Sequence, residues 1–295
     1  MPRSIRFFFR DRWKDGTVSS SSEDVDPDGV ILYEPANTQV TELSGLWQSE
    51  SGDVTAAYLS NDLGGAYRIG AVCIVRTNLT ENATIRVRVG NTFNFSTNLY
   101  DSGVVQRDRY FSNAEITAAR TSEFFLNGLP LPNTQLRIQR QVHAFILPSE
   151  VTAQYVRVDF SDAGNPDGRI QVGYVYAGIV YEPSNDLLFG WQLQRDNVVR
   201  GGQAASGQYW SADVFHKTLV SFALAPQSES TVLNIWMLFE HLINTNQIFL
   251  MQLVDFTDSL RFTTTLYCRM VNPVANRKIA FNSYGLIFSA EEVID

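Results

Sequence analysis

The chain has 295 residues, a formal net charge of −8 at pH 7 and a pI near 5.0. An acidic chain lacks the positive surface that attracts nucleic acids and anionic membranes, so we expect no nucleic-acid partner. Charged residues make up 18% of the chain, below the ~25% usual for soluble proteins, which favours extra surface buried against copies or partners. The length allows two packed cores, because single cores tend to stop growing near ~250 residues.

The first predicted element is a short strand over 5–10, in which Ile5, Phe7 and Phe9 fall on one side. This apolar run is too short for a signal peptide or a membrane span. We therefore expect no membrane insertion, and a protein made and kept in a cytoplasm until it is assembled or released. A serine-rich acidic loop over 18–28 and a turn-rich passage over 33–48 follow.

Three successive strands are predicted next, over 54–59, 67–75 and 84–89. Their connections, 60–65 and 76–82, are rich in Asn, Asp and Gly, and short strands at this spacing are typical of a sandwich or jelly roll. Residues 92–133 are less regular, with a short helix at 114–122 as one option. An extended pattern returns over 135–147.

The stretch 152–181 predicts a β-hairpin. Apolar residues alternate with polar ones over 155–160 and 169–176, the period of a half-buried strand. Between the two lies the turn sequence Asn165-Pro166-Asp167-Gly168, in which Pro presets one turn position and Gly can take a positive φ.

The character of the chain changes near Ser184. We expect a turn at Gly201-Gly202, a strand over 217–225, and strands over 248–254, 261–269 and 279–288. One helix is predicted, with Ser228 or Ser230 as its N-cap. Its apolar stripe consists of Val232, Ile235, Trp236, Phe239, Leu242 and Ile243. Strands followed by a helix and further strands indicate an α+β unit, separated from the front part at about Pro183.

No motif for chemistry is present. The histidines His143, His216 and His241 have no metal-ligand spacing, and the sequence has no HExxH, GxSxG, P-loop or GxGxxG motif. Two carboxylates that face each other across a cleft, as in a glycosidase, leave no local signature. We predict no catalytic residue, no metal site and no cofactor. Cys73 and Cys268 lie in apolar runs, which favours two buried thiols over a disulfide.

Aromatic residues at loop edges are the candidate contact residues. They are Trp47, Tyr58, Tyr67, Tyr100 and Tyr110. Such rings can offer flat apolar faces to sugars. The alternative, that they fill the sandwich or a seam between subunits, is favoured.

Several motifs, in order, resemble a known family. Residues 56–75 (AAYLSNDLGGAYRIGAVCIV) are similar to the strand, "D-L-G" turn and strand of the discoidin-like, galactose-binding-like β-sandwich, and 78–89 fit its next passage. Residues 155–160 and the run from Asn165 to Ile170 resemble the closing part of such domains in virion proteins of tailed bacteriophages. Phe189-Gly190, Gly201-Gly202 and the ending Glu291-Glu292-Val293 resemble features of the α+β domain that follows there. The long insertion and the unmatched sugar-binding loops depart from that pattern.

The resemblance implies a mainly β protein. A discoidin-like jelly-roll sandwich would occupy 1–183, with an insertion at about 92–141, and a smaller α+β assembly domain with one main helix would occupy 184–295. It also implies a structural protein of the tail tip or baseplate of a long-tailed phage, located in the virion tail. Its partners would be copies of itself, as a ring or other oligomer, and other tail proteins. The alternatives are a host-glycan-binding module of the virion and, less favoured, a glycan-degrading enzyme.

Overall fold

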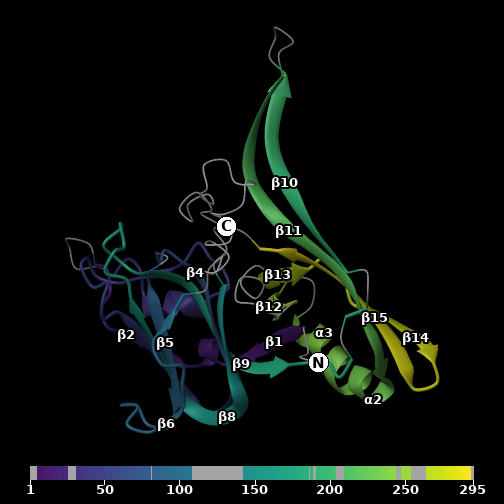
Figure 1. Ribbon diagram of the computed structural model, residues 1–295, viewed down its shortest axis with the longest axis horizontal. Helices are drawn as coiled ribbons and strands as arrows, with labels where there is room; N and C mark the ends of the chain where they lie inside the picture. Colours follow the sequence, from purple (N-terminus) through teal and green to yellow (C-terminus); the bar gives the residue numbers. More distant parts are fainter. Residues whose placement is uncertain are drawn as a thin grey trace, which may run out of the picture.

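The computed structural model describes residues 5–25, 31–80, 82–107, 142–185, 187–188, 191–203, 209–243, 247–253 and 264–293. In these residues the chain is mostly β with one main helix, which confirms the predicted fold class (Figure 1). The strands are β1 (Arg6–Asp11), β2 (Thr17–Ser20), β3 (Trp47–Gln48), β4 (Tyr58–Thr77), β5 (Thr84–Gly90), β6 (Asn98–Asp101), β7 (Val105–Gln106), β8 (Val142–Ser161), β9 (Gln171–Tyr181), β10 (Gln192–Gln203), β11 (Tyr209–Ser228), β12 (Ile248–Gln252), β13 (Thr265–Met270), β14 (Ala275–Ala280) and β15 (Ser283–Glu292). Two short 3-10 helices, η1 (Trp13–Asp15) and η2 (Pro35–Gln39), follow β1 and precede β3.

Two long strands build both layers of the N-terminal sandwich. The first half of β4 pairs with the second half of β8, and β2 and β5 extend this layer on either side. The second half of β4 pairs with the first half of β8 and with β9 in the other layer. The register shifts between Asp62 and Tyr67 and between Ile69 and Ala71, and bulges of this kind let a strand bend from one layer into the next.

The separate strands predicted over 54–59 and 67–75 are therefore wrong. Residues 60–62 pair with β8, and residues 63–66 form a bulge inside β4, where Gly64 has a φ of +74°, because β8 continues to pair on both sides of the bulge. Residues 18–20, predicted as part of a loop, instead belong to β2.

The predicted hairpin over 152–181 is also wrong, although its turn is confirmed. The Gly168 amide donates to the Asn165 carbonyl oxygen at 3.1 Å, and Gly168 has a φ of +64°. The flanking strands β8 and β9 lie on opposite sides of β4. The turn therefore connects the two layers, and the period-two pattern alone could not distinguish this crossing from a hairpin.

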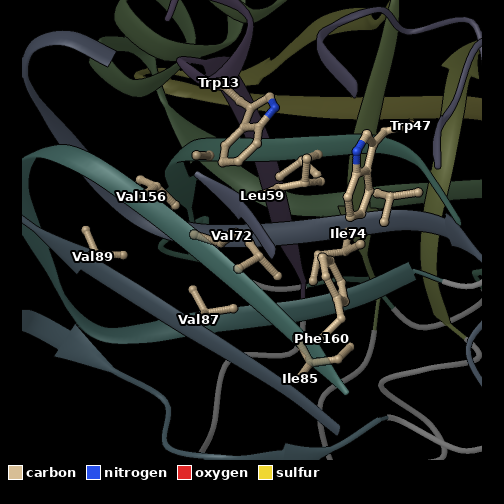
Figure 2. Packing of buried hydrophobic residues seen from close by; sticks show 14 of the residues in the cluster. Trp13, Trp47, Leu59, Val72, Ile74, Ile85, Val87, Val89, Val156 and Phe160 are labelled. Atoms are coloured by element: carbon tan, nitrogen blue, oxygen red, sulfur yellow. The ribbon is translucent and has the colours of Figure 1, made fainter. Parts of the chain in front are cut away.

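The sandwich core fills the space between the two layers. Figure 2 shows Trp13, Trp47 and Phe160 pointing into the same interior as Val72 of β4 and Val87 of β5. These side chains are fully buried, and full burial of a large apolar side chain contributes roughly 1.5–3 kcal/mol. The core therefore ties η1, β3 and both layers together.

A second core lies around the helix, which runs through α2 (Glu229–Thr231), η3 (Val232–Trp236) and α3 (Met237–Ile243). The predicted helix is confirmed, with a π-type turn at η3. The Ser228 hydroxyl accepts a hydrogen bond from the Thr231 amide at 3.2 Å, which makes Ser228 the N-cap. Four stripe residues are buried and the other two pack against the cluster; the buried ones are Val232, Trp236, Phe239 and Ile243.

Strand β1, whose prediction is confirmed, joins the two cores. It pairs with β9 of the sandwich on one side and with β12 on the other. Because strand side chains alternate, Phe7 and Phe9 enter the core around the helix. Phe8 enters a third cluster together with Tyr174 and Tyr176 of β9. The division of the chain at about residue 183 stays a prediction.

Two further predictions in the C-terminal part are wrong. The single strand over 279–288 is a hairpin of β14 and β15, with Asn282 at a φ of +53° in its turn. Gly201 and Gly202 lie within β10 and pair with Ser211 and Trp210, so they form no turn. The predicted helix at 114–122 lies outside the described residues.

Candidate functional site

The outer face of one sandwich layer carries an ordered array of ionic and aromatic side chains. We call it the arginine–tyrosine face; its residues are Tyr58 of β4, Arg86 and Arg88 of β5, Asp101 of β6, and Arg157 and Asp159 of β8. Successive side chains of a strand point to opposite faces. In β5 and β8 the residues that alternate with the arginine–tyrosine face, such as Val87 and Val158, belong to the core. Strand alternation and cross-strand register therefore bring these groups together.

Asp159 lies at the centre of this face. It pairs across the strands with Tyr58 and with Arg86. Both of its oxygens accept hydrogen bonds from Arg88, at 2.9 and 2.7 Å, and Oδ1 also accepts one from Arg157 Nε at 2.8 Å. The guanidinium carbon of Arg157 lies 3.6 Å from the centroid of the Tyr58 ring, within the range of a cation–π contact. The ring and the two guanidinium groups are therefore held in a fixed arrangement.

A second ion pair extends the face towards the sheet edge. Arg86 Nε and one terminal nitrogen donate to the two oxygens of Asp101 at 2.9 and 2.5 Å, the two-pronged geometry that suits a guanidinium and a carboxylate. The hydrogen bond from Arg86 is the main cause that lowers the pKa of Asp101 to about 2. Asp101 therefore stays ionised and acts as an acceptor.

The face ends near the bend of β4 in two further rings. Tyr155 and Phe93 meet edge to face with 5.9 Å between their centroids, and Phe93 is 67% exposed. Gln154 Nε2 donates to Asp62 at 2.9 Å and to the Tyr155 hydroxyl at 3.2 Å. The Gln154 contact is the main cause that lowers the pKa of Asp62.

This arrangement is suited to binding rather than to proton transfer. Guanidinium groups offer fixed donors, carboxylates offer acceptors, and the rings offer flat apolar area. A general acid needs a carboxyl whose pKa is raised towards neutrality, whereas the pKa of Asp62 and of Asp101 is lowered. The face can therefore contact a hydroxyl-rich ligand without giving up a proton.

The structure does not bring the predicted aromatic residues together. Tyr58 belongs to the arginine–tyrosine face, and Tyr67, near the bend of β4, lies under the Arg12 guanidinium with 4.5 Å to the ring centroid. Tyr100 packs against the edge of the sandwich core, and burial raises its pKa. Trp47 is fully buried and donates from Nε1 to the Ser22 carbonyl oxygen at 3.1 Å, so no ring surface remains for a ligand. Tyr110 lies outside the described residues.

Sequence reasoning missed the arginine and aspartate residues of the face. The signal that could have found them is the alternation in TIRVRV and YVRVDF, which places charges of opposite sign on one side of two neighbouring strands. Predicting that these charges face each other requires the knowledge that β5 lies next to β8. The sequence pattern does not reveal this.

A second candidate functional feature is a projecting two-stranded ribbon, which we call the arm and define as residues 195–203 and 209–218. β10 and β11 pair from Gln192 and Ser221 to Gln203 and Tyr209. β15 pairs with β11 only from Leu219 onwards, so the described part of the arm has no third strand. Figure 1 shows the ribbon extending far from the rest of the molecule.

Ion pairs hold the base of the arm. Lys217 Nζ lies 2.8 Å from Glu291 Oε2, and Arg269 Nε donates to the other oxygen of Glu291 at 2.7 Å. The Lys217 contact is the first cause that lowers the pKa of Glu291. The ribbon is therefore fixed to β13 and β15 where it leaves the sheet.

Cys73 and Cys268 are both buried thiols that are not joined in a disulfide, which confirms the prediction, and burial raises the pKa of Cys268. Among the described residues, no three His, Cys, Asp or Glu side chains lie close enough to hold a metal ion. No helix in the described part of the chain is long and apolar enough to cross a membrane.

No family model matches this chain, and no curated protein is significantly similar to it. Solved structures do resemble it. A GH29 fucosidase of Ruminococcus gnavus in complex with fucose is 14% identical over 60% of this chain, with a TM-score of 0.39. This chain spans 28% of that fucosidase chain.

Two other solved structures are smaller. A family 32 carbohydrate-binding module from NanJ of C. perfringens, in complex with galactose, is 12% identical over 60% of this chain and 99% of that chain, with a TM-score of 0.36. The lectin domain of lectinolysin, complexed with Lewis B antigen, is 11% identical over 58% of this chain and 96% of that chain, with a TM-score of 0.35. None of these three is described as a phage protein.

Proposed function

We propose that this chain is a non-catalytic structural protein that assembles with other protein chains through its arm, and that it does so in the tail tip or baseplate of a phage. The observation that carries the proposal is the two-stranded arm beyond Leu219. An isolated two-stranded ribbon is marginally stable in water, and exposed strand edges readily pair with another chain. A partner that covers the arm would satisfy its edges.

The base of the arm supports this role. Lys217, Glu291 and Arg269 fix its direction, so the ribbon would reach a partner with little loss of orientational freedom on binding. The phage tail as its location is supported by the ordered motifs over 56–75 and 165–170 and at the C-terminus, including Glu291-Glu292-Val293.

Mass spectrometry of purified particles from the cells that produce this protein tests the location, and electron microscopy of particles tagged at Asp295 locates the copies. We expect the chain in tail fractions. Its absence from every particle fraction would overturn the proposed location.

An in-register deletion tests the arm. Removal of 197–203 and 209–216 keeps the pairing of Asp196 with Lys217 and leaves the pairing of β11 with β15 intact. We expect this variant to fold but to be lost from assembled particles. Arg86→Ala, on the arginine–tyrosine face, is the control that should still assemble; unchanged assembly of the arm variant would contradict the proposal.

A second candidate function is glycan binding by the arginine–tyrosine face. It is favoured by the contact between Arg157 and Tyr58, which presents fixed donors beside a ring. Galactose, fucose and Lewis B antigen are suitable first probes on a glycan array. Tyr58→Ala and Arg157→Ala should abolish binding, whereas Arg68→Ala, outside this face, should not. Equal binding by all variants would count against this site.

A further inference from the structure

We propose that the outer face of the β14–β15 hairpin docks onto the acidic loop of a second copy of this chain, in a head-to-tail contact. The large apolar residues of this hairpin surface are Ile279 of β14, Phe281 of the turn and Ile287 of β15. The acidic loop comprises residues 21–25 and 31–34, together with Glu50. The inference is independent of the arm and goes beyond the proposed function.

Hydrogen bonds fix one face of the hairpin against the helix. The Glu229 amide donates to Asn282 Oδ1 at 3.1 Å, and Asn276 Nδ2 donates to Glu240 at 3.2 Å. The Tyr284 hydroxyl donates to Glu229 Oε1 at 3.4 Å. These contacts hold the hairpin in place at both of its ends.

The apolar residues of the hairpin lie on its other face. In β15, Leu286 enters the core around the helix, so Gly285 and Ile287 face away from the helix. The Ile279 Cγ2 atom lies 3.8 Å from the position of a Cβ atom at Gly285. Ile279 and Ile287 therefore share this outer face, to which the turn residue Phe281 is adjacent.

The apolar exposure of the hairpin surface is large. Phe281, at the tip of the hairpin, is 95% exposed, and Ile279 of β14 is 52% exposed. Ile287 of β15, on the same face as Ile279, is 51% exposed. Several large apolar side chains on one rigid surface indicate a protein contact, and aromatic residues are enriched in such contacts.

The charge of the hairpin surface suits an acidic partner. All six residues of β14 are exposed, and Arg277, which pairs with Gly285, lies on the face away from the helix. Glu229 and Glu240 lie on the helix side and already accept hydrogen bonds from Tyr284 and Asn276. Arg277 has no ion pair among the described residues, so its charge is available to a carboxylate of another chain.

The acidic loop of this same chain has the complementary properties. An isolated bridge between Val25 and Ile31 and a 3.1 Å hydrogen bond from the Leu32 amide to the Asp24 carbonyl oxygen hold it together. Val25, Ile31 and Leu32 are 49%, 41% and 51% exposed. Glu34 and Glu50 are exposed, and the Glu50 amide donates to Ser22 Oγ of this loop at 3.2 Å, while Asp24 is paired with Arg169.

The positions of the two surfaces favour a contact between copies. β2, which leads into the acidic loop, lies at the left of Figure 1, and β14 lies at the right. A contact between two different surfaces of the same chain is heterologous, and repeated copies then form a closed ring or an open filament.

Sedimentation velocity of the full chain across a range of concentrations tests the contact. We expect the parent to self-associate and Phe281→Ser to weaken the association by roughly tenfold or more, because a central aromatic anchor contributes at least 1.4 kcal/mol. Phe93→Ser, at an exposed ring of the sandwich, is the matched control and should associate like the parent.

A charge exchange identifies the partner surface. Arg277→Glu and Glu34→Arg should each weaken self-association alone, and mixing the two variants should restore it, because opposite charges then face each other in both contacts. A parent that stays monomeric, or association that Phe281→Ser leaves unchanged, would overturn the proposal. If the mixture of the two variants does not restore association, the acidic loop is not the partner surface.

A membrane is the competing target of an apolar, cationic hairpin surface. Binding to vesicles of phosphatidylcholine and phosphatidylglycerol that Phe281→Ser abolishes, without self-association of the parent, would overturn the proposal in favour of a lipid surface. The arm deletion described above should leave self-association through the head-to-tail contact unchanged. The proposal for the arm and the proposal for the head-to-tail contact can therefore fail independently.

Discussion

The Tyr174 hydroxyl donates a 2.8 Å hydrogen bond to Asp11 Oδ2 where β1 meets the sandwich. Asp11 Oδ1 also accepts from the Trp13 amide at 2.9 Å and the Ala177 amide at 3.2 Å. Burial nevertheless raises the pKa of Asp11 to about 6, because three neutral donors do not compensate fully for lost hydration. The joint between the two cores therefore contains a carboxyl group that titrates at mild pH.

Asp11→Asn should change how stability depends on pH. The folded state holds the proton of Asp11 more tightly than the unfolded state, so the contribution of Asp11 to the free energy of unfolding falls as pH rises from 3.8 to about 6. The total fall is about 3 kcal/mol. Urea denaturation of parent and variant across this window should show the variant gaining relative stability towards higher pH. A constant difference between them would contradict the prediction.

His143 should act with the opposite sign. Burial lowers the pKa of His143 from 6.5 to about 3. Between these two pH values the unfolded chain binds a proton at His143 and the folded chain does not. Its stabilising contribution is present above pH 6.5 and is lost as pH falls towards 3. His143→Gln should reduce this loss in acid, measured by the same urea titrations. An unchanged acid slope would show that the folded state accommodates the charged ring.

Local pattern predicted the helix and β1 because their apolar residues follow a clear period. The stripe from Val232 to Ile243 and the cap at Ser228 depend on neighbours within one or two turns. The turn at Gly168 is equally local, because a positive φ and one hydrogen bond define it. Such features require no knowledge of distant segments.

Long-range pairing decided the features that the sequence could not predict. The Asn and Gly residues of 60–65 favour a turn, yet β8 pairs with β4 up to Asp62 and again from Tyr67, so cross-strand hydrogen bonds override local preference. The arginine–tyrosine face is non-local in the same way, since Arg88 and Asp159 are 71 positions apart. Position at a loop edge predicts an exposed ring for each of the five aromatic residues, whereas packing buries Trp47.

Phe7→Ala should destabilise the chain strongly. The Phe7 ring lies 5.0 Å from Trp236, 5.5 Å from Phe288 and 5.6 Å from Phe239, centroid to centroid, and its side chain is fully buried. Loss of such a ring costs about 3–5 kcal/mol. Chemical denaturation should show a lower midpoint with an unchanged slope. Phe93→Ala, at a 67% exposed ring, should stay within about 0.5 kcal/mol of the parent.

Gly178→Ala should weaken the joint between the sandwich and β1. A Cβ atom at position 178 would lie 2.5 Å from the Arg10 carbonyl oxygen and 2.6 Å from the Tyr176 hydroxyl. That hydroxyl lies 2.8 Å from the Phe9 carbonyl oxygen and 2.6 Å from the Ile179 carbonyl oxygen and shares its one proton between them, so moving it would disrupt this hydrogen bonding. β1 must shift instead, and overpacking of this kind costs about 1–3 kcal/mol.

Gly164→Ala is the control for this substitution, because a Cβ atom there meets nothing within 4 Å. Hydrogen exchange should locate the effect. In Gly178→Ala we expect faster exchange of the β1 amides that pair with β9, because a shift of β1 weakens their hydrogen bonds. The amides of β5, which pair with β8 in the other layer, should exchange as in the parent. Equal protection of β1 in both glycine variants would show that the joint can absorb a methyl group.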